Sequence, residues 1–536
     1  MGYRGISLLA VSFCVLSGPL AAATFDVTNG AELEAALATA QSNGEGDTIN
    51  LAPGLYTSGS GFSYLAAATE NFPISLAGTG PGVTVLDGGD AHRVLGIETT
   101  AVTPDDAGAD VALSGLTIQN GEVSSAFGVG GGLRVVAFKA DISLSDSVIQ
   151  RNRVVPANGH SGGAFLATFD GAVTISNSVV AGNSASSGGG LRARAQGDGS
   201  ITITDSLFTG NKSLDSDASG GGLAVDATNG AALVQGNHFI RNESVDNGGG
   251  AGVAQNGFGT TTFVNNVFFD NLAGDDGGGF AYDSNGAGPL NFVNNTVYAN
   301  RSQGNGGGVY LNIQGDDVEA LLYNSIVFGN EADGEGQDIY ADDDPDGDDD
   351  GAPLTLANNN FSDFSTFCQN EGSCVTDITQ TDNLPGLNPL FLDPSSDDLR
   401  LSEFSPCIDE GDLAAPDLPA VDLEGDPRVI GSAPDIGADE RNVCGDGALG
   451  AEETCDDGNA ADGDGCSATC QEESPGSATP SPSPSPGDDD EDDDGTIGGG
   501  GCSLQPGAGP SGLGALGSIF SALGYFAIRS RRSARA

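Results

Sequence analysis

Apolar and polar positions alternate through the middle of the chain in a motif that returns about every 29 residues. Each copy opens with a glycine triplet or a close variant, and apolar residues stand at the third and fifth positions after its first glycine. Alternation with a period of two indicates one short, half-buried strand in each copy. In the second copy these positions hold Phe165 and Ala167. The copies begin at Gly130, Gly162, Gly188, Gly220, Gly248, Gly277 and Gly306, with a degenerate copy at Gly334.

A second marker, an asparagine that closes a short apolar stretch, keeps step with the glycines. We expect these asparagines to stack into ladders, in which each side-chain amide bonds to its copy in the next coil. Asn and Gly also tolerate the left-handed backbone that sharp corners require. The marker ends at Asn152, Asn183, Asn211, Asn242, Asn271, Asn300 and Asn330.

The repeats predict an all-β fold. Each copy supplies two or three short strands and cannot bury a core alone, whereas a stack of copies buries a continuous apolar column. A β-propeller is the alternative, but its blades repeat at about 40 residues or more. We therefore expect a right-handed parallel β-helix, with Leu191, Leu223, Phe280 and Val309 on one internal line.

The residues before the repeats predict a cap. Residues 31–42 have the apolar spacing of a helix, and Asn29 precedes them as a candidate N-cap. A helix over the first coil would provide the polar outer face that a solenoid needs at its end.

The charge balance excludes one class of partner. The 536 residues include 75 Asp and Glu against 18 Lys and Arg, which gives a net charge of −57. Nucleic-acid binding depends on clusters of Lys and Arg, so we expect none. An acidic surface of this kind also attracts Ca²⁺, which is therefore the one candidate cofactor.

Both ends of the chain have the composition of export signals. Residues 1–23 have the pattern of a signal peptide, with Arg4 before a short apolar run and cleavage next to Ala23. Residues 474–501 form a linker rich in Ser-Pro, acidic residues and Gly. Residues 502–536 contain the apolar stretch 513–528 and four terminal arginines that would stay cytoplasmic. A simple tail anchor is one interpretation of this end.

The sequence from Gly500 to Leu504, Gly-Gly-Cys-Ser-Leu, resembles the signature of bacterial C-terminal sorting signals of the CTERM type, closest to the JDVT-CTERM group. The resemblance implies recognition by a processing protease at Cys502. It also implies delivery to the cell surface or outer membrane of a Gram-negative bacterium, held in the membrane by the C-terminal segment or by a lipid.

Residues 441–473 predict a compact disulfide module, because four cysteines lie close together in an exported chain. The module resembles the myxobacterial-type cysteine-rich repeat. Zinc is the alternative, since Cys466 and Cys470 have ligand spacing. The short loop from Cys368 to Cys374 is the other expected disulfide, which leaves Cys407 single. The cysteines of the module are Cys444, Cys455, Cys466 and Cys470.

Two segments downstream of the repeats, residues 387–412 and 422–440, resemble the closing segment of bacterial choice-of-anchor Q proteins. The segments 24–56 and 74–88 resemble the N-terminal end of secreted, pectate-lyase-like β-helix proteins. Together with the repeats, these resemblances span residues 24–440. They imply a β-helix on the cell surface and say little about chemistry.

Two functional hypotheses fit these observations. The first is a non-enzymatic surface protein for adhesion, matrix building or carbohydrate binding, because a fold alone confers no activity. The second is a pectate-lyase-like lyase or hydrolase that acts on acidic polysaccharide. Its catalytic candidates are Arg192, Arg194 and Asp226, which the repeat places near one another. An outward arginine can also simply offset the acidic surface.

Further polar residues at outward positions are candidates for ligand and metal binding. The ligand-binding candidates are Arg134, Asp283, Tyr310 and Asn312. The calcium candidates are Asp344, Asp346 and Asp348, whose spacing suits a calcium loop. The calcium loop lacks the closing Glu of an EF-hand, and a solvated acidic loop is its alternative.

Overall fold

The computed structural model describes residues 22–473 with several gaps. The chain divides into two units, Met1–Glu472 and Glu473–Ala536, and the features below belong to the first. Among the described residues, no helix is long and apolar enough to cross a membrane. The gaps are 68–69, 100–107, 125–127, 156–161, 216–218, 285–287, 314–318, 343–352, 368–377, 446, 448, 450–452, 460, 463–464 and 468.

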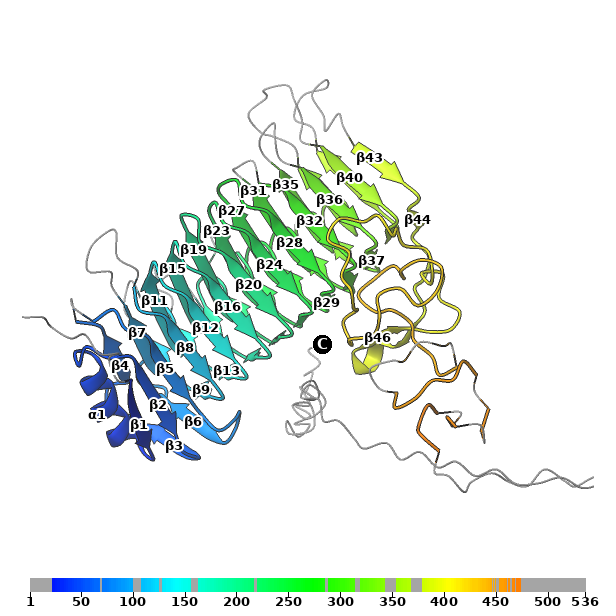
Figure 1. Ribbon diagram of the computed structural model, residues 1–536. Helices are drawn as coiled ribbons and strands as arrows, with labels where there is room; N and C mark the ends of the chain where they lie inside the picture. The colour runs from blue at the N-terminus through cyan, green and yellow to red at the C-terminus, as the bar shows by residue number, and fades with distance from the viewer. Residues whose placement is uncertain are drawn as a thin grey trace, which may run out of the picture. The chain divides into compact units, whose positions relative to one another are not determined.

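The described chain winds into a parallel β-helix of stacked coils (Figure 1). Most coils contribute one strand to each of four sheets, here named A, B, D and C in chain order. Sheet A contains β1 (Ala23–Val27), β2 (Asp47–Leu51), β5 (Ile74–Ala77), β8 (Val111–Ser114), β12 (Ile142–Ser145), β16 (Val173–Ser176), β20 (Ile201–Thr204), β24 (Ala232–Gln235), β28 (Thr261–Val264), β32 (Leu290–Val293), β36 (Ala320–Tyr323), β40 (Leu354–Ala357) and β43 (Ile378–Thr381). Sheet B contains β3 (Gly54–Thr57), β6 (Thr84–Asp87), β9 (Thr117–Gln119), β13 (Val148–Gln150), β17 (Val179–Ala181), β21 (Leu207–Thr209), β25 (His238–Ile240), β29 (Val267–Phe269), β33 (Thr296–Tyr298), β37 (Ile326–Phe328), β41 (Asn360–Phe361) and β44 (Leu384–Pro385).

The other two sheets complete each coil. Sheet D has strands of two residues, whereas sheet C has the longest strands and carries the glycine-triplet repeats. Sheet D contains β10 (Glu122–Val123), β14 (Arg153–Val154), β18 (Ser184–Ala185), β22 (Lys212–Ser213), β26 (Glu243–Ser244), β30 (Leu272–Ala273), β34 (Arg301–Ser302) and β38 (Glu331–Ala332). Sheet C contains β4 (Phe62–Leu65), β7 (Leu95–Glu98), β11 (Leu133–Phe138), β15 (Ala164–Phe169), β19 (Leu191–Gln196), β23 (Leu223–Ala227), β27 (Ala251–Gln255), β31 (Phe280–Ser284), β35 (Val309–Ile313), β39 (Ile339–Asp342) and β42 (Phe364–Phe367).

The predicted cap helix is present as α1 (Gly30–Ala40). The side chain of Asn29 accepts a hydrogen bond from the backbone N–H of Glu32, as expected of an N-cap. The helix buries Leu33 and Leu37 against the first coil, so the apolar core does not end in water.

The predicted internal line is confirmed. Leu191 pairs in register with Leu223, and Phe280 pairs with Val309, with Ala251 between the two pairs. All five side chains are fully buried in the main apolar cluster. The period-two pattern therefore identified the inner face of sheet C correctly.

The second repeat was predicted in the wrong register. Ala164, not Phe165, pairs with Leu191, so Phe165 and Ala167 lie on the outer face of β15. The glycine stretch before this strand is one residue shorter than in the other copies, and a shift of one residue moves every side chain to the opposite face. The degenerate last copy also starts later than predicted, since the left-handed glycine is Gly336 rather than Gly334.

The marker asparagines form the predicted ladder inside the corner between sheets B and D. The Nδ2 of each donates to the Oδ1 of the next at 2.8–3.1 Å, and the ladder ends on Asp338. Each amide also donates to a backbone carbonyl of the preceding coil, as Asn242 does to Phe208 at 2.9 Å. These side chains are buried, and the ladder satisfies their polar atoms.

A second ladder, which the sequence analysis missed, lies in the corner between sheets A and B. Here the backbone N–H of each residue donates to the side-chain oxygen of the next at 2.9–3.2 Å. Its members are Ser147, Ser178, Ser206, Asn237, Asn266, Asn295, Ser325, Asn359 and Asn383.

The left-handed corners lie one residue before the ladder residues rather than on them. Arg241 precedes Asn242 with φ of 55°, and Asn265 precedes Asn266 with φ of 54°. The corner residue turns the chain, and the following side chain then points into the interior and joins the ladder.

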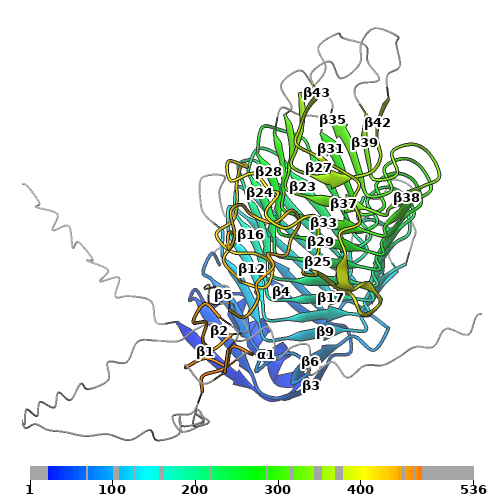
Figure 2. The same ribbon diagram turned by 90° about the vertical axis from the view of Figure 1, so that its right-hand side faces the viewer.

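The closing segment, residues 387–440, lies against the outer face of the later coils (Figure 2). Corner asparagines hold it there through their outward amides. Asn265 donates to the carbonyl of Val421 at 2.7 Å, and Asn294 donates to the carbonyl of Asp435 at 3.0 Å. The corner position therefore has two functions, because it turns the coil and also docks this segment. The segment contains β45 (Phe391–Asp393), a short 3-10 helix (Pro394–Ser396) and β46 (Asp398–Leu401).

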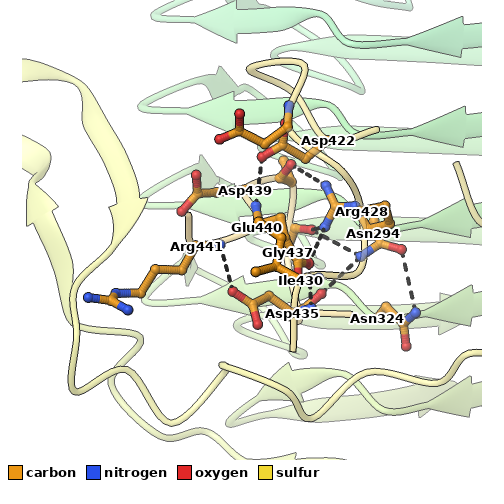
Figure 3. Close-up of polar contacts among 12 residues, drawn as sticks. Asn294, Asn324, Asp422, Arg428, Ile430, Asp435, Gly437, Asp439, Glu440 and Arg441 are labelled. Carbon is orange, nitrogen blue, oxygen red and sulfur yellow. Dashed lines mark hydrogen bonds and ion pairs between the residues drawn. The ribbon is translucent and has the colours of Figure 1, made fainter. Parts of the chain in front are cut away.

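A buried arginine anchors the closing segment to the coils (Figure 3). The guanidinium of Arg428 is 1% exposed and donates to the carbonyls of Gly437 and Ala438 and to Oδ1 of Asn265. Glu440 lies 3.7 Å from it and accepts backbone N–H bonds from Ile430 and Asp435. Burial, followed by the nearby Asp435, raises the pKa of Glu440 to about 8.

The predicted cysteine-rich module contains two disulfides, Cys444–Cys470 and Cys455–Cys466. The zinc alternative is wrong, because Cys466 and Cys470 belong to different disulfides. Cys407 is a buried free thiol, as expected.

The asparagine ladder predicts a large penalty for Asn242→Ala. The change removes the acceptor of Asn211 and the donor to the Phe208 carbonyl. Each buried polar group that loses its partner costs about 1–3 kcal/mol, so we expect destabilisation of about 3 kcal/mol in urea unfolding followed by circular dichroism. Asn256→Ala is the matched control, since Asn256 is exposed on the same coil. Equal effects of the two changes would contradict the ladder.

The Arg428 anchor predicts local release of the closing segment in Arg428→Met. Removal of one partner from a buried charged network costs about 3–5 kcal/mol. Limited proteolysis should then cut within residues 387–440 much faster than in the parent, while the coils stay resistant. Arg441→Met is the control, because the side chain of Arg441 points away from the network (Figure 3). An unchanged cleavage pattern in Arg428→Met would refute the anchor.

Candidate functional site

The outer face of sheet C places three arginines on two strands that are two coils apart. Arg134 of β11 pairs with Phe165 of β15, and Phe165 pairs with Arg192 of β19. These two arginines and the phenylalanine between them therefore share one outward column. Arg194 lies two residues further along β19, in the next column. The pairing therefore places Arg134 and Arg192 in one column, two coils apart.

Two of these arginines form ion pairs, and the third does not. Arg134 contacts Glu98 at 2.8 Å, and Arg192 contacts Asp226 at 2.5 Å. Asp226 pairs in register with Arg194, yet its carboxylate bonds diagonally to Arg192. Among the described residues, Arg194 has no ion-pair partner and is half-buried. Its guanidinium is therefore available to an anion.

Aromatic rings flank the arginines. Phe138 and Phe169 follow in the third outward column, and their rings stack with centroids 5.2 Å apart and planes 4° apart. Phe169 is 38% exposed, so part of its side chain meets solvent. We call the six residues the arginine–phenylalanine patch: Arg134, Phe138, Phe165, Phe169, Arg192 and Arg194.

A second polar group lies on the same face toward the C-terminal end. Asp283 of β31 pairs with Asn312 of β35, and the Asn312 amide donates to Asp283 at 3.2 Å. The hydroxyl of Tyr310 donates to Asp342 at 3.4 Å, and the Tyr310 ring stacks on Tyr340 with centroids 5.8 Å apart.

This second group is acidic. Burial, opposed in part by a backbone N–H bond from Asn305, raises the pKa of Asp276 to about 6. Burial and the neighbouring Asp342 raise the pKa of Tyr340 to about 12, so its hydroxyl stays protonated. Arg134, the fourth predicted ligand-binding residue, lies six strands from Asn312 in sheet C, ~30 Å at the usual strand spacing. The face therefore has a basic end and an acidic end.

A third feature, absent from the sequence analysis, lies between sheet B and the closing segment. A cavity of about 80 Å³ is lined by the side chains of His238, Arg400, Glu424 and Asp439. Burial lowers the pKa of His238 to about 4, so the ring is neutral at neutral pH. Carboxylate oxygens of Asp422, Glu424 and Asp439 lie within 4.8 Å of one another. Asp422, Glu424 and Asp439 lie in the closing segment, which has no periodic pattern, so the sequence contained no signal for this carboxylate cluster.

The remaining candidates lie at the margins of the structure. Ala23 is the first residue of β1, where it pairs with Asp47. Six predicted residues lie outside the described residues: Asp344, Asp346, Asp348, Cys368, Cys374 and Cys502.

The regular coils resemble a known protein family. Residues 131–325 match the family described as "Right handed beta helix region". The matched range covers the regular coils and agrees with their parallel stacking. No curated protein matches the chain.

Two solved structures illustrate the similarity of fold. Pectate lyase Pel9A is 16% identical, with a TM-score of 0.43 over 76% of this chain and 90% of that chain. A mutant of the PL6-family alginate lyase AlyGC is 16% identical, with a TM-score of 0.31 over 67% of this chain and 53% of that chain. With TM-scores below 0.5, neither similarity assigns a substrate or a reaction to this chain.

Proposed function

We propose that the protein is an exported, non-enzymatic surface β-helix that binds an acidic polysaccharide on the outer face of sheet C. The observation that carries the proposal is the arginine–phenylalanine patch. In a chain with 18 basic residues against 75 acidic ones, three arginines gather beside three phenylalanines, of which Phe169 is exposed and the others are half-buried. Guanidinium groups bind carboxylates in a bidentate manner, and flat apolar rings stack on sugar faces.

The spacing of the patch suits a chain of sugars. Neighbouring coils are ~4.8 Å apart, which is of the same order as the length of one sugar unit. A polysaccharide that runs along the stack would meet Arg134, Phe165 and Arg192 on successive coils. Arg194 would supply the guanidinium without a carboxylate partner, and the acidic end of the face would repel the polyanion and limit the length bound.

Binding without turnover agrees with what lies beside the patch. The outward residues of the next two strands are Ala224 and Asp226, then Gly252 and Ala254. Three of the four are small and offer neither a base nor a metal ligand, and the one carboxylate, Asp226, is held by Arg192. A lyase acting on acidic polysaccharide is the second candidate, and one observation favours it. An unpaired Arg194 beside the Arg192–Asp226 pair is the kind of group that abstracts the substrate proton, or stabilises the negative charge left behind, in β-elimination.

The decisive variant is Arg194→Ala, because it breaks no ion pair. We expect its affinity for polygalacturonate or alginate oligomers to fall about tenfold in calorimetry, equivalent to ~1.4 kcal/mol. Arg153→Ala, which removes an exposed arginine of sheet D, should leave affinity unchanged.

Two outcomes separate the alternatives. If neither polymer binds the parent protein, or if both variants bind equally well, the patch is not the site. If the parent generates the ultraviolet absorbance of unsaturated uronate, the lyase candidate replaces the binding protein.

The proposal includes export and processing. The two terminal signals support it. Cleavage after Ala23 would remove the first residue of β1 with its pairing to Asp47, and the strand would then begin at Thr24. Mass spectrometry of the surface-released protein should find a mature N-terminus at Thr24 and a C-terminus at or next to Cys502. Peptides from 511–536 still joined to Cys502 would refute processing and leave a simple tail anchor.

A further inference from the structure

A polar cluster is buried beneath the cap helix, at the N-terminal end of the stack. Asp47 begins β2, Tyr64 lies in β4, and Glu70 follows β4 (Figure 1). Their exposed fractions are 3%, 1% and 1%. The loop after α1, residues 43–46, contacts the cluster through Asn43 and Gly44.

The hydrogen bonds of this cluster are incomplete. Oδ1 of Asp47 accepts from Nδ2 of Asn43 at 2.7 Å, and Oε2 of Glu70 accepts from the N–H of Gly44 at 2.8 Å. Oε1 of Glu70 and the hydroxyl of Tyr64 have no partner among the described residues. The nearby Tyr56 differs, since its hydroxyl reaches two backbone carbonyls. Unpaired buried polar atoms call for an explanation such as a bound ion or water.

The cluster also lacks a positive charge. None of the ion pairs in the described part of the chain involves Asp47 or Glu70. Burial raises the pKa of both carboxyl groups, and Asp47 raises that of Glu70 further. Glu45 adds another negative charge beside Asp47. Burial and both carboxylates raise the pKa of Tyr64 as well.

We propose that this cluster binds a divalent cation of the calcium type, with Asp47, Glu70 and the hydroxyl oxygen of Tyr64 as ligands. All available donors are hard oxygen atoms, which Ca²⁺ prefers. Two carboxylates balance the charge of one such ion, whereas a water molecule would satisfy the unpaired atoms and leave both charges buried.

The ion would connect the cap to the first coil. Asp47 follows the loop that leaves α1, and Glu70 lies after the strand of sheet C that the helix covers. Bound Ca²⁺ should therefore stabilise the contact between the cap and the first coil.

The test is thermal unfolding of the purified full chain after treatment with a chelator, with and without added CaCl₂. We expect Ca²⁺ to raise the Tm. Glu70→Gln should abolish this rise. Glu319→Gln, which alters an exposed carboxylate on a distant coil, should retain it. An unchanged Tm in the parent, or equal rises in parent and Glu70→Gln, would overturn the site.

Tyr64→Phe provides a second test that does not depend on the fate of Glu70. Without the ion it should be at least as stable as the parent, because it removes an unpaired hydroxyl. The chain contains no Trp, so tyrosine sensitises the luminescence of bound Tb³⁺. The parent should show this luminescence, and added Ca²⁺ should abolish it by displacing Tb³⁺. Tyr64→Phe should lose most of the luminescence. Equal luminescence in the two proteins would place the ion on the acidic surface instead.

Discussion

Parallel pairing of each coil with the next, locked by buried side-chain ladders, is the constraint on which the rest of this structure depends. The strands have two to six residues, too few to be stable in isolation. Each backbone N–H and carbonyl finds its partner one repeat away, so the repeats must keep their register. The two ladders lie at either end of sheet B and carry that register through both corners. Before β15 the glycine stretch is one residue short, and the asparagine ladder nevertheless continues from Asn152 through Asn183 to Asn211.

Fixed register turns the outer faces into columns of side chains at regular spacing. Arg134, Phe165 and Arg192 form one such column, although they are far apart in the sequence. The corner residues form another, and their outward amides hold the closing segment over the later coils. The same repeat therefore generates the core, the docking surface and the candidate binding face. Any function arises from what stands at outward positions, since the fold itself specifies none.

The repeats made most of the core predictable. Leu191, Leu223, Phe280 and Val309 were placed correctly because their period and register repeat without interruption. Phe165 was assigned to the wrong face because positions in each copy were counted from the first glycine. The glycine stretch of the second copy is one residue short, which shifts the count by one. The second ladder was missed because Ser replaces Asn in four of its nine members, which conceals the pattern.

The candidate sites were less predictable, for a physical reason. The strand register placed Asp226 beside Arg194, but the flexible side chain of Arg192 reaches Asp226 diagonally. The spacing of residues in the sequence does not predict side-chain rotamers, so this ion pair could not be foreseen. Two further sites, the cluster of Asp47, Tyr64 and Glu70 and the anchor at Arg428, assemble from non-repeating segments. No sequence periodicity therefore predicts them.

Arginine-directed chemical labelling tests the central claim most directly, because the chain has so few arginines. With an acidic oligosaccharide bound, labelling followed by mass spectrometry should show protection of Arg194, and weaker protection of Arg134 and Arg192. The exposed Arg153 and Arg301 should label as before. Protection elsewhere, or bound oligosaccharide with no change at Arg194, would contradict the account.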